Sequence, residues 1–235
     1  MPYLRRKIKG RRHMDILQAI SERHSVRSYT SQPIEGDVKQ KLLDLIGRCN
    51  NESGLNMQLV TEEPKAFGSK LVHYGKFKGV KNYIVMAGAS DDEQKCGYYG
   101  QRVVLEAQTL GLNTCWVGLT YKKVGKAYTL RPGDKVHVVI AIGYGETQGV
   151  KHKIKKVEEV ASVADGSPMP EWFRNGVEAA LLAPTAMNQQ KFHFTLQPDG
   201  TVELSTKWGF YCHVDMGIAK LHFELASGHT VASQR

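Results

Sequence analysis

A pattern that occurs twice along the chain constrains the fold more than any other feature. The segments Gly54–Val60 (GLNMQLV) and Ala186–Phe192 (AMNQQKF) each follow an apolar helical stretch, and each carries an Asn-x-Gln triplet. Two later apolar helices also match, because glycines open and close them at the same spacing, Gly100 to Gly111 and Gly217 to Gly228. Two correspondences in the same order predict an internal duplication with a shorter second copy. The alternative is that any two helix-then-strand units resemble one another.

The apolar periodicity predicts an alternation of helices and strands. Proline and glycine mark several boundaries, since Pro170 suits a first helical turn and Gly111 suits a helix C-cap. Helices are expected over 14–24, 36–49, 91–110, 170–184 and 215–228, strands over 82–88 and 136–145, and a hairpin over 191–205.

Charge is concentrated at one end of the chain. Of the net charge of +9, six units come from the segment 1–13, which has no acidic residue, so the remainder carries 9 − 6 = +3. We expect 1–13 to be a disordered basic leader or an artefact of start-codon choice. A nucleic-acid-binding arm is the alternative, although no recognition motif accompanies it. No secretory signal and no apolar run of roughly 18–20 residues is present, so a cytoplasmic protein without a membrane span is expected.

Residues that could carry chemistry by themselves are scattered. The four cysteines have no zinc-binding spacing, and we expect them to be reduced small core residues. Neither a Ser/His/Asp order nor a pair of carboxylates for acid–base work stands out. If the chain is an enzyme, its reactive chemistry is therefore expected to come from a cofactor.

Three short segments are candidates for holding a ligand. In an extended backbone, Arg23, Ser25 and Arg27 would project to the same side and could bind an anion, although a solvated surface run is the alternative. Lys151-His152-Lys153 follows a strand end and could meet the same anion, or it could be an exposed basic loop. Gly118 permits a flat ligand to approach the backbone closely, or it only makes a tight connection. The segment 143–149 (GYGETQG) is not read as a dinucleotide fingerprint, because the basic sequence after it cannot form a packed helix.

Together these segments resemble the nitroreductase family, from about residue 14 to residue 228. The resemblance rests on R-H-S-V-R at 23–27, G-L-N-T-C-W-V-G at 111–118, I-G-Y-G at 142–145 with K-H-K beyond it, and A-P-T-A-M-N-Q-Q-K-F-H-F at 183–194. It implies an α+β fold with a central mixed or antiparallel sheet flanked by helices, and an FMN-dependent oxidoreductase.

The resemblance also implies roles for individual residues. Arg23, Ser25, Lys151 and Lys153, with His24 beside them, resemble the ligands of the FMN phosphate and ribityl chain. Arg27 resembles the cation near the flavin pyrimidine edge, and Gly118–Leu119 resembles the backbone near N5 and O4. In the family, the partner subunit supplies one wall of the flavin site. The residues here that resemble this wall are Pro184, Thr185, Ala186 and Asn188. Lysine replaces the usual arginine at Lys153, and Gln190-Lys191-Phe192 replaces Q-P-W.

The order of these motifs departs from the family, whose A-P-S-x-x-N element comes soon after R-x-S-x-R. Here the better copy lies far downstream, so the chain resembles a single-chain pseudo-dimer subgroup, with a first half at 14–156 and a truncated second half at 157–235. One FMN per chain is expected, in a monomeric pseudo-dimer or a homodimer.

The resemblance implies ping-pong hydride transfer from NADH or NADPH to a nitroaromatic, quinone or similar small electron-poor acceptor. Two alternatives remain open. One is an FMN-binding protein with other flavin chemistry or no reductase turnover, and the other is a basic nucleic-acid-binding protein.

Overall fold

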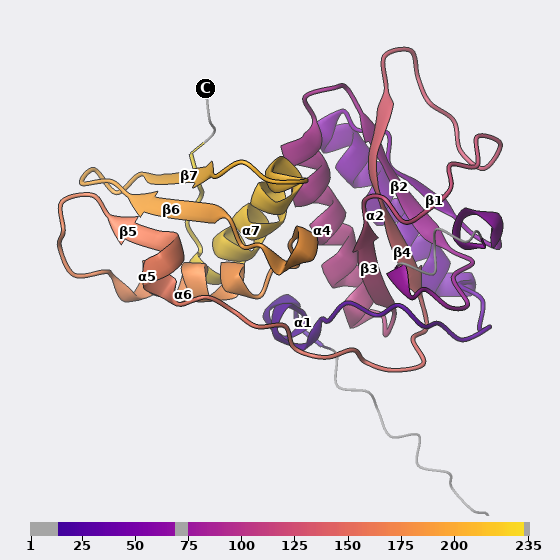
Figure 1. Cartoon of the computed structure of the whole chain (residues 1–235), viewed down its shortest axis with the longest axis horizontal. Helices are drawn as coiled ribbons and strands as arrows, with labels where there is room; N and C mark the ends of the chain where they lie inside the picture. Colours follow the sequence, from indigo (N-terminus) through magenta and orange to yellow (C-terminus); the bar gives the residue numbers. More distant parts are fainter. Residues whose placement is uncertain (1–13, 69–74, 233–235) are drawn as a thin grey trace, which may run out of the picture.

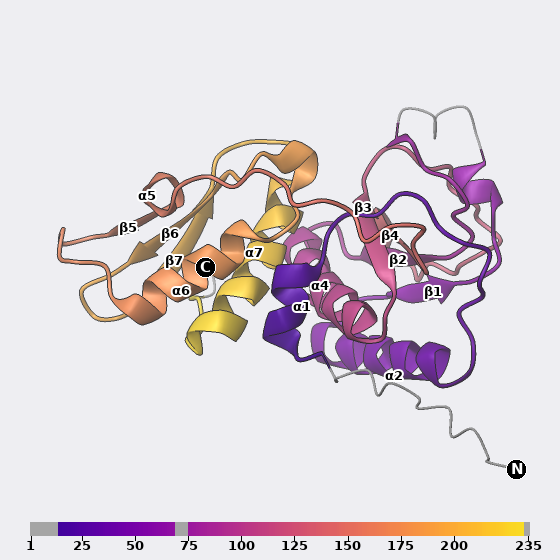
Figure 2. The ribbon, with the colours of Figure 1, turned by 90° about the horizontal axis from the view of Figure 1, so that it is seen from below.

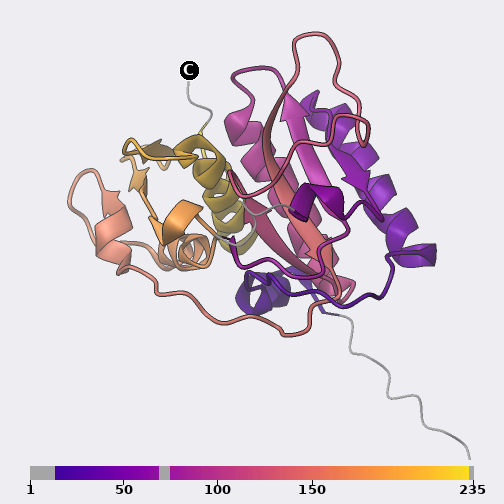
Figure 3. The same ribbon diagram turned by 45° about the vertical axis from the view of Figure 1, so that its right-hand side comes forward.

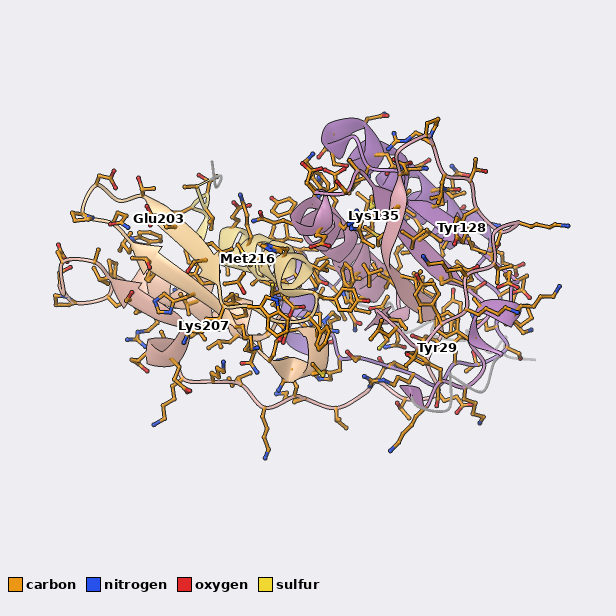
Figure 4. The ribbon with its side chains drawn as sticks, turned by 45° about the horizontal axis from the view of Figure 1, so that its top comes forward. Tyr29, Tyr128, Lys135, Glu203, Lys207 and Met216 are labelled. Carbon is orange, nitrogen blue, oxygen red and sulfur yellow. The ribbon has the colours of Figure 1, made fainter. Side chains whose placement is uncertain are left out.

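The computed structural model describes residues 14–68 and 75–232, so the expected basic leader at 1–13 lies outside the described residues. A four-stranded and a three-stranded sheet lie on opposite sides of a central pair of long helices, α4 (Glu93–Thr109) and α7 (Cys212–Ser227) (Figure 1). Met216, near the start of α7, lies between the two sheets (Figure 4). The expected α+β fold with an antiparallel central sheet is confirmed.

The first sheet contains β1 (Gln58–Val60), β2 (Tyr83–Gly88), β4 (Lys135–Gly143) and β3 (Asn113–Val117), in that order and with antiparallel pairing throughout. Its central strands are continuous apolar runs because both faces are covered. Ile84 and Met86 face one core cluster, whereas Tyr83 and Val85 face another. On the first of these faces lie α4 and α2 (Gly36–Ser53) (Figure 2).

Helix ends in the first half follow familiar local rules. α1 (Ile16–Glu22) begins after Asp15, whose side chain accepts a hydrogen bond of 2.8 Å from the Gln18 N–H. α2 ends at Gly54, which has φ = 77°, a left-handed conformation that glycine adopts without strain. A short 3₁₀ turn, η1 (Lys65–Phe67), covers the second face of the sheet with Phe67.

The second half combines short helices with a smaller sheet. It contains α5 (Val157–Val160), β5 (Ala161–Val163), α6 (Glu171–Leu181), the 3₁₀ turn η2 (Ala186–Asn188), β6 (Phe192–Leu196), β7 (Val202–Thr206) and α7. The hairpin expected over 191–205 is present as the antiparallel pair β6–β7, and β5 pairs with β6 in parallel. Figure 3 shows this sheet with α6 and α7 packed against it.

The two halves meet where α4 crosses α7, and glycines make this contact possible. A side chain at Gly97 would collide with the carbonyl oxygen of Val214, and a side chain at Gly217 would collide with that of Gln94. The helices therefore approach each other backbone to backbone, which a larger residue at either position would prevent.

One long connection, residues 149–156, joins the halves, and we call it the strap. It contains no helix or strand, in agreement with the expectation that no packed crossover helix follows Gly145. It leaves β4 and runs along the lower edge of the molecule to α5 (Figure 1). The strands that the periodicity did not predict are β1, β3 and β5, which have three to five residues and are too short to show it.

Candidate functional site

A cavity of about 130 Å³ lies between the two halves. Its wall combines the segment after α1, strand β3, the turn η2 and the first turns of α7. The lining residues are Ser25, Arg27, Cys115, Trp116, Val117, Gly118, Val138, Pro184, Thr185, Ala186, Met187, Tyr211, Val214, Asp215 and Ile218. Six of the sequence-predicted residues therefore lie around one cavity: Ser25, Arg27, Gly118, Pro184, Thr185 and Ala186.

The segment that carries Ser25 and Arg27 is held in an extended form by the edge of the sheet. Ser25 forms a parallel bridge with Thr114, and the Val26 N–H donates to the Thr114 carbonyl at 3.0 Å. Ser25 and Arg27 thus point to the same side, as their spacing predicts. The Arg27 guanidinium also lies 5.9 Å from the centre of the Phe77 ring, within the range of a cation–π contact.

Arg23 does not line this cavity, although the spacing places it with Ser25 and Arg27. It is the C-cap residue of α1 and is only 2% exposed. Its Nε and Nη1 have no hydrogen-bond partner among the described residues. Burial lowers the pKa of Arg23 to about 10. An unpaired buried guanidinium is costly, and a bound anion would relieve that cost.

The strap brings Lys151 and His152 near Arg23 and His24. Burial lowers the pKa of His24, and the charges of Arg23, Lys151 and His152 lower it further, so these four groups lie together in one electropositive region whose charge comes from Arg23 and Lys151. The His152 Nε2–H donates to the Leu181 carbonyl at 3.0 Å. Lys151 and the neighbouring Lys153 are exposed and lie outside the cavity wall.

The position of Asn188 differs from the expectation of a cavity wall. Asn188 and Leu119 are not among the lining residues. The Asn188 Nδ2 donates instead to the Lys153 carbonyl at 2.8 Å, so this side chain contacts the strap. Leu119 is exposed to solvent next to Gly118.

Gly118 is confined by an aromatic ring. A side chain there would collide with the ring of Tyr211, which lines the same cavity. Tyr211 itself has φ = 57°, a left-handed conformation that is uncommon for a large residue. The close approach of the two segments therefore depends on glycine at position 118.

Asp215 is a site residue that the sequence reasoning missed. It is 5% exposed and lines the cavity, and its carboxylate accepts hydrogen bonds from the Ala186 N–H (2.9 Å) and from Gln189 Nε2 (2.7 Å). Burial raises the pKa of Asp215 to about 6, although both donors act in the opposite direction. Asp215 thus holds the Pro184–Ala186 wall in place. An acid among the apolar residues Val214, Met216 and Ile218 was the available signal.

Cys115 is the second missed residue, and it faces Ser25 and the arginines. Burial raises the pKa of its thiol, while the charges of Arg27 and Arg23 and a hydrogen bond with Ser25 oppose that rise. Its place inside the G-L-N-T-C-W-V-G segment was the only signal in the sequence.

A buried hydrogen-bond network stands behind the cavity wall. Trp116 Nε1 donates to Gln101 Oε1 at 3.1 Å, and Gln101 Nε2 lies 2.8 Å from His222 Nε2. Because His222 Nδ1 lies 3.0 Å from the Ala179 carbonyl, which can only accept, Nδ1 carries the proton and Nε2 accepts from Gln101. Burial lowers the pKa of His222 to about 3, so this histidine is neutral. The network ties Trp116 to both α4 and α7.

The described residues contain no group of three or more side chains that could hold a metal ion. No helix within 14–68 or 75–232 has both the length and the apolar character to cross a membrane. The arrangement offers instead a narrow cavity with one guanidinium on its wall and a second cationic region beside it.

The chain is similar to several known proteins. The model of a family described as "Putative TM nitroreductase" matches residues 15–227. A solved "putative nitroreductase" from Thermotoga maritima is 23% identical, with a TM-score of 0.65 over 94% of this chain and 88% of that one. Another "putative nitroreductase", from Desulfovibrio desulfuricans in complex with FMN, is 22% identical, with a TM-score of 0.47 over 66% of this chain and 98% of that one.

No curated protein matches the chain significantly. The family match spans nearly all of the described residues, and the Thermotoga maritima structure shares the fold. The chain therefore belongs to the "Putative TM nitroreductase" family and is an FMN-dependent oxidoreductase of the nitroreductase type.

Proposed function

We propose that the chain binds one FMN at the cavity between its halves and uses it to oxidise NADH or NADPH. The observation that carries this proposal is the composition of the wall. Ser25, Arg27 and Gly118 come from the first half, and Pro184–Ala186 comes from the second, as the family resemblance requires of a shared flavin site. We expect the protein to act in the cytoplasm on a small electron-poor acceptor.

The residues present fit a flavin with a terminal phosphate. Ligand sites for molecules of this size usually measure about 300–1000 Å³, so a cavity of about 130 Å³ would enclose only part of FMN. The remainder would extend toward the electropositive region of Arg23, His24, Lys151 and His152. The guanidinium of Arg23, which has no hydrogen-bond partner for Nε and Nη1 within the described part of the chain, is the strongest evidence that this region binds an anion.

Each side chain would have a separate task. Arg27 would stabilise negative charge that develops at the pyrimidine edge on reduction. Gly118 would let a planar ring approach the backbone, and Asp215 would hold the opposite wall through the Ala186 N–H. When bound, FMN supplies hydride transfer between NAD(P)H and an acceptor such as a nitroaromatic or a quinone, in a ping-pong sequence.

We further propose that the two halves, 14–156 and 157–235, are copies of one plan, so that the chain forms a pseudo-dimer by itself. The reciprocal contacts of Gly97 and Gly217 are what a two-fold axis between α4 and α7 would produce. This axis pairs Gly217 with Gly97 and not with Gly100, the glycine that the sequence spacing matched to it. Lys95 and Tyr98 then take the places of Asp215 and Ile218, and both line a second, open cavity of about 790 Å³.

That second cavity lacks an equivalent of the arginines. Its charges are already paired, since Lys220 lies 3.8 Å from Glu224, and Tyr98 donates to Glu224 at 2.8 Å. Without unpaired cations it offers nothing that favours a phosphate. One FMN per chain follows.

The test is an absorption spectrum of the purified protein, before and after anaerobic addition of NADH or NADPH. FMN bound to the protein should give a yellow solution that bleaches with the reductant and recovers its colour with a quinone. A colourless protein that takes up no added FMN would contradict the proposal. Yellow protein that neither nucleotide bleaches would favour the alternative of an FMN-binding protein without this reductase activity.

A further inference from the structure

The Asn-x-Gln triplet of the second half forms hydrogen bonds with the backbone of the strap. Gln190 is 3% exposed, and its Nε2 donates to the Lys153 carbonyl and to Asn188 Oδ1, both at 2.9 Å. Its Oε1 accepts from the Lys155 N–H at 2.9 Å. Asn188 Nδ2 donates to the same Lys153 carbonyl at 2.8 Å. Two amides thus converge on one backbone oxygen of a segment that is distant in sequence.

The first-half triplet makes the same arrangement on another loop. Gln58 Nε2 donates to the Thr129 carbonyl (2.6 Å) and to Asn56 Oδ1 (3.1 Å), and Gln58 Oε1 accepts from the Thr129 N–H (3.0 Å). Asn56 Nδ2 donates to that carbonyl as well, at 2.9 Å. The two Asn-x-Gln pairs are therefore one device used twice, and we call each pair a clamp.

The two clamps differ in what they hold. The strap has no helix or strand, and among the described residues its hydrogen bonds to the second half come mainly from residues 188–190. Lys155 Nζ adds two of them, to the carbonyls of Gln189 (3.0 Å) and Gln190 (2.7 Å). His152 and the cap of α5 at Lys156 make the other contacts. The position of the strap thus depends on this clamp.

Backbone strain distinguishes the clamps as well. Met187, Asn188 and Gln190 have φ of 51°, 54° and 44°, which is unfavourable for residues with side chains. Asn56 and Gln58 are not in this conformation. The second-half clamp keeps a strained backbone, which persists only where surrounding contacts enforce it and is common at functional sites.

We propose that Asn188 and Gln190 are positioning residues, which fix the strap across the two halves so that Lys151 and Lys153 face the phosphate of the cofactor. The inference rests on the proposed FMN site for the identity of the ligand. Both lysines are exposed, and Lys151 borders the region of Arg23 and His24, so a fixed strap would add its charge to an anion site that is already partly formed. A loose strap would leave the lysines solvated and too mobile to favour the phosphate.

The first experiment uses the protein without added flavin. Gln190→Met keeps the length of the side chain and removes its hydrogen bonds, and Gln58→Met is the matched control. Hydrogen–deuterium exchange should become at least about tenfold faster at strap amides, including that of Lys155, only in Gln190→Met. Unchanged exchange at the strap would overturn the clamp.

The second experiment compares FMN with riboflavin, which lacks the phosphate. In Gln190→Met, the affinity for FMN should fall about tenfold or more while the affinity for riboflavin changes little, and Gln58→Met should bind both as the wild type does. Adding Lys153→Gln to Gln190→Met should cause little further loss, because both changes remove the same contact.

A second variant protects the test against misfolding. Asn188→Gly removes the amide and tolerates φ = 54°, so it should shift the preference for FMN in the same direction without breaking the turn. An equal loss of affinity for FMN and for riboflavin in both variants would show that the clamp has only a structural role. If the wild-type protein binds neither flavin, the proposed function itself fails and the positioning of the phosphate fails with it, whereas failure in the variants alone concerns the clamp.

Discussion

Gly97 of α4 and Gly217 of α7 each face the backbone of the other helix, and each contacts the turn that precedes the other glycine. This reciprocity places the two halves of the chain against each other with little freedom to shift. The cavity lies beside this crossing, since Val214, Asp215 and Ile218 of α7 form part of its wall.

Gly217→Ala should destabilise the fold, because the added methyl group would collide with the Gln94 carbonyl and force the helices apart. Overpacking of this kind costs about 1–3 kcal/mol, and a backbone clash places the effect at the upper end. Urea denaturation measures it. The control is Gly125→Ala, whose side chain would enter open space. Equal stability of the two variants would mean that the helices separate without cost.

Arg23→Met should lower the affinity for FMN without lowering the free energy of unfolding of the flavin-free protein. In the flavin-free protein, removing an unpaired buried guanidinium should leave the free energy of unfolding unchanged or raise it. FMN affinity should fall by about tenfold or more, because a charged contact to the phosphate is lost. Thermal unfolding without flavin and fluorescence titration with FMN give the two values. Full FMN affinity in this variant would remove Arg23 from the site.

Asp215 predicts a pH dependence of stability. Its pKa is raised from 3.8 to about 6 in the folded protein, so the folded state holds the proton more strongly than the unfolded state does. The stabilisation is complete below about pH 4 and is lost as the pH rises to about 6, by about 2–3 kcal/mol. Asp215→Asn keeps an oxygen that can accept from the Ala186 N–H and should remove this dependence.

Urea denaturation of Asp215→Asn and the wild-type protein at several pH values between 4 and 7 measures the difference. The free energy of unfolding of the wild type should fall relative to that of the variant over this range. A constant difference would show that Asp215 has an ordinary pKa.

The proposed pseudo-dimer predicts the stoichiometry of binding. A titration of flavin-free protein with FMN should saturate at one FMN per chain, because the cavity around Lys95 and Tyr98 has no unpaired guanidinium. Size-exclusion chromatography with light scattering reports the mass of the same sample. Saturation at two FMN per chain would contradict the inequivalence of the two cavities.

The sequence by itself determined most of the regular structure. Apolar periodicity located α2, α4, α6, α7 and the β6–β7 hairpin, since these elements are long enough to show a period. It also showed the repeated Asn-x-Gln triplet and the extended Arg-x-Ser-x-Arg segment, because both depend on local spacing. The resemblance of the motifs to the nitroreductase family then predicted that the two halves would meet at a shared site.

Only the tertiary structure decided which of these residues line the cavity, which are buried elsewhere and which hold other segments in place. Arg23 lies in the core while Arg27 lines the cavity, and Asn188 holds the strap, because packing against α4, α6 and α7 determines which side of each segment is enclosed. The raised pKa of Asp215 has the same origin, since burial comes from residues far away in sequence. Spacing along a chain encodes local direction, whereas exposure to water and long-range hydrogen bonds exist only once distant segments have packed together.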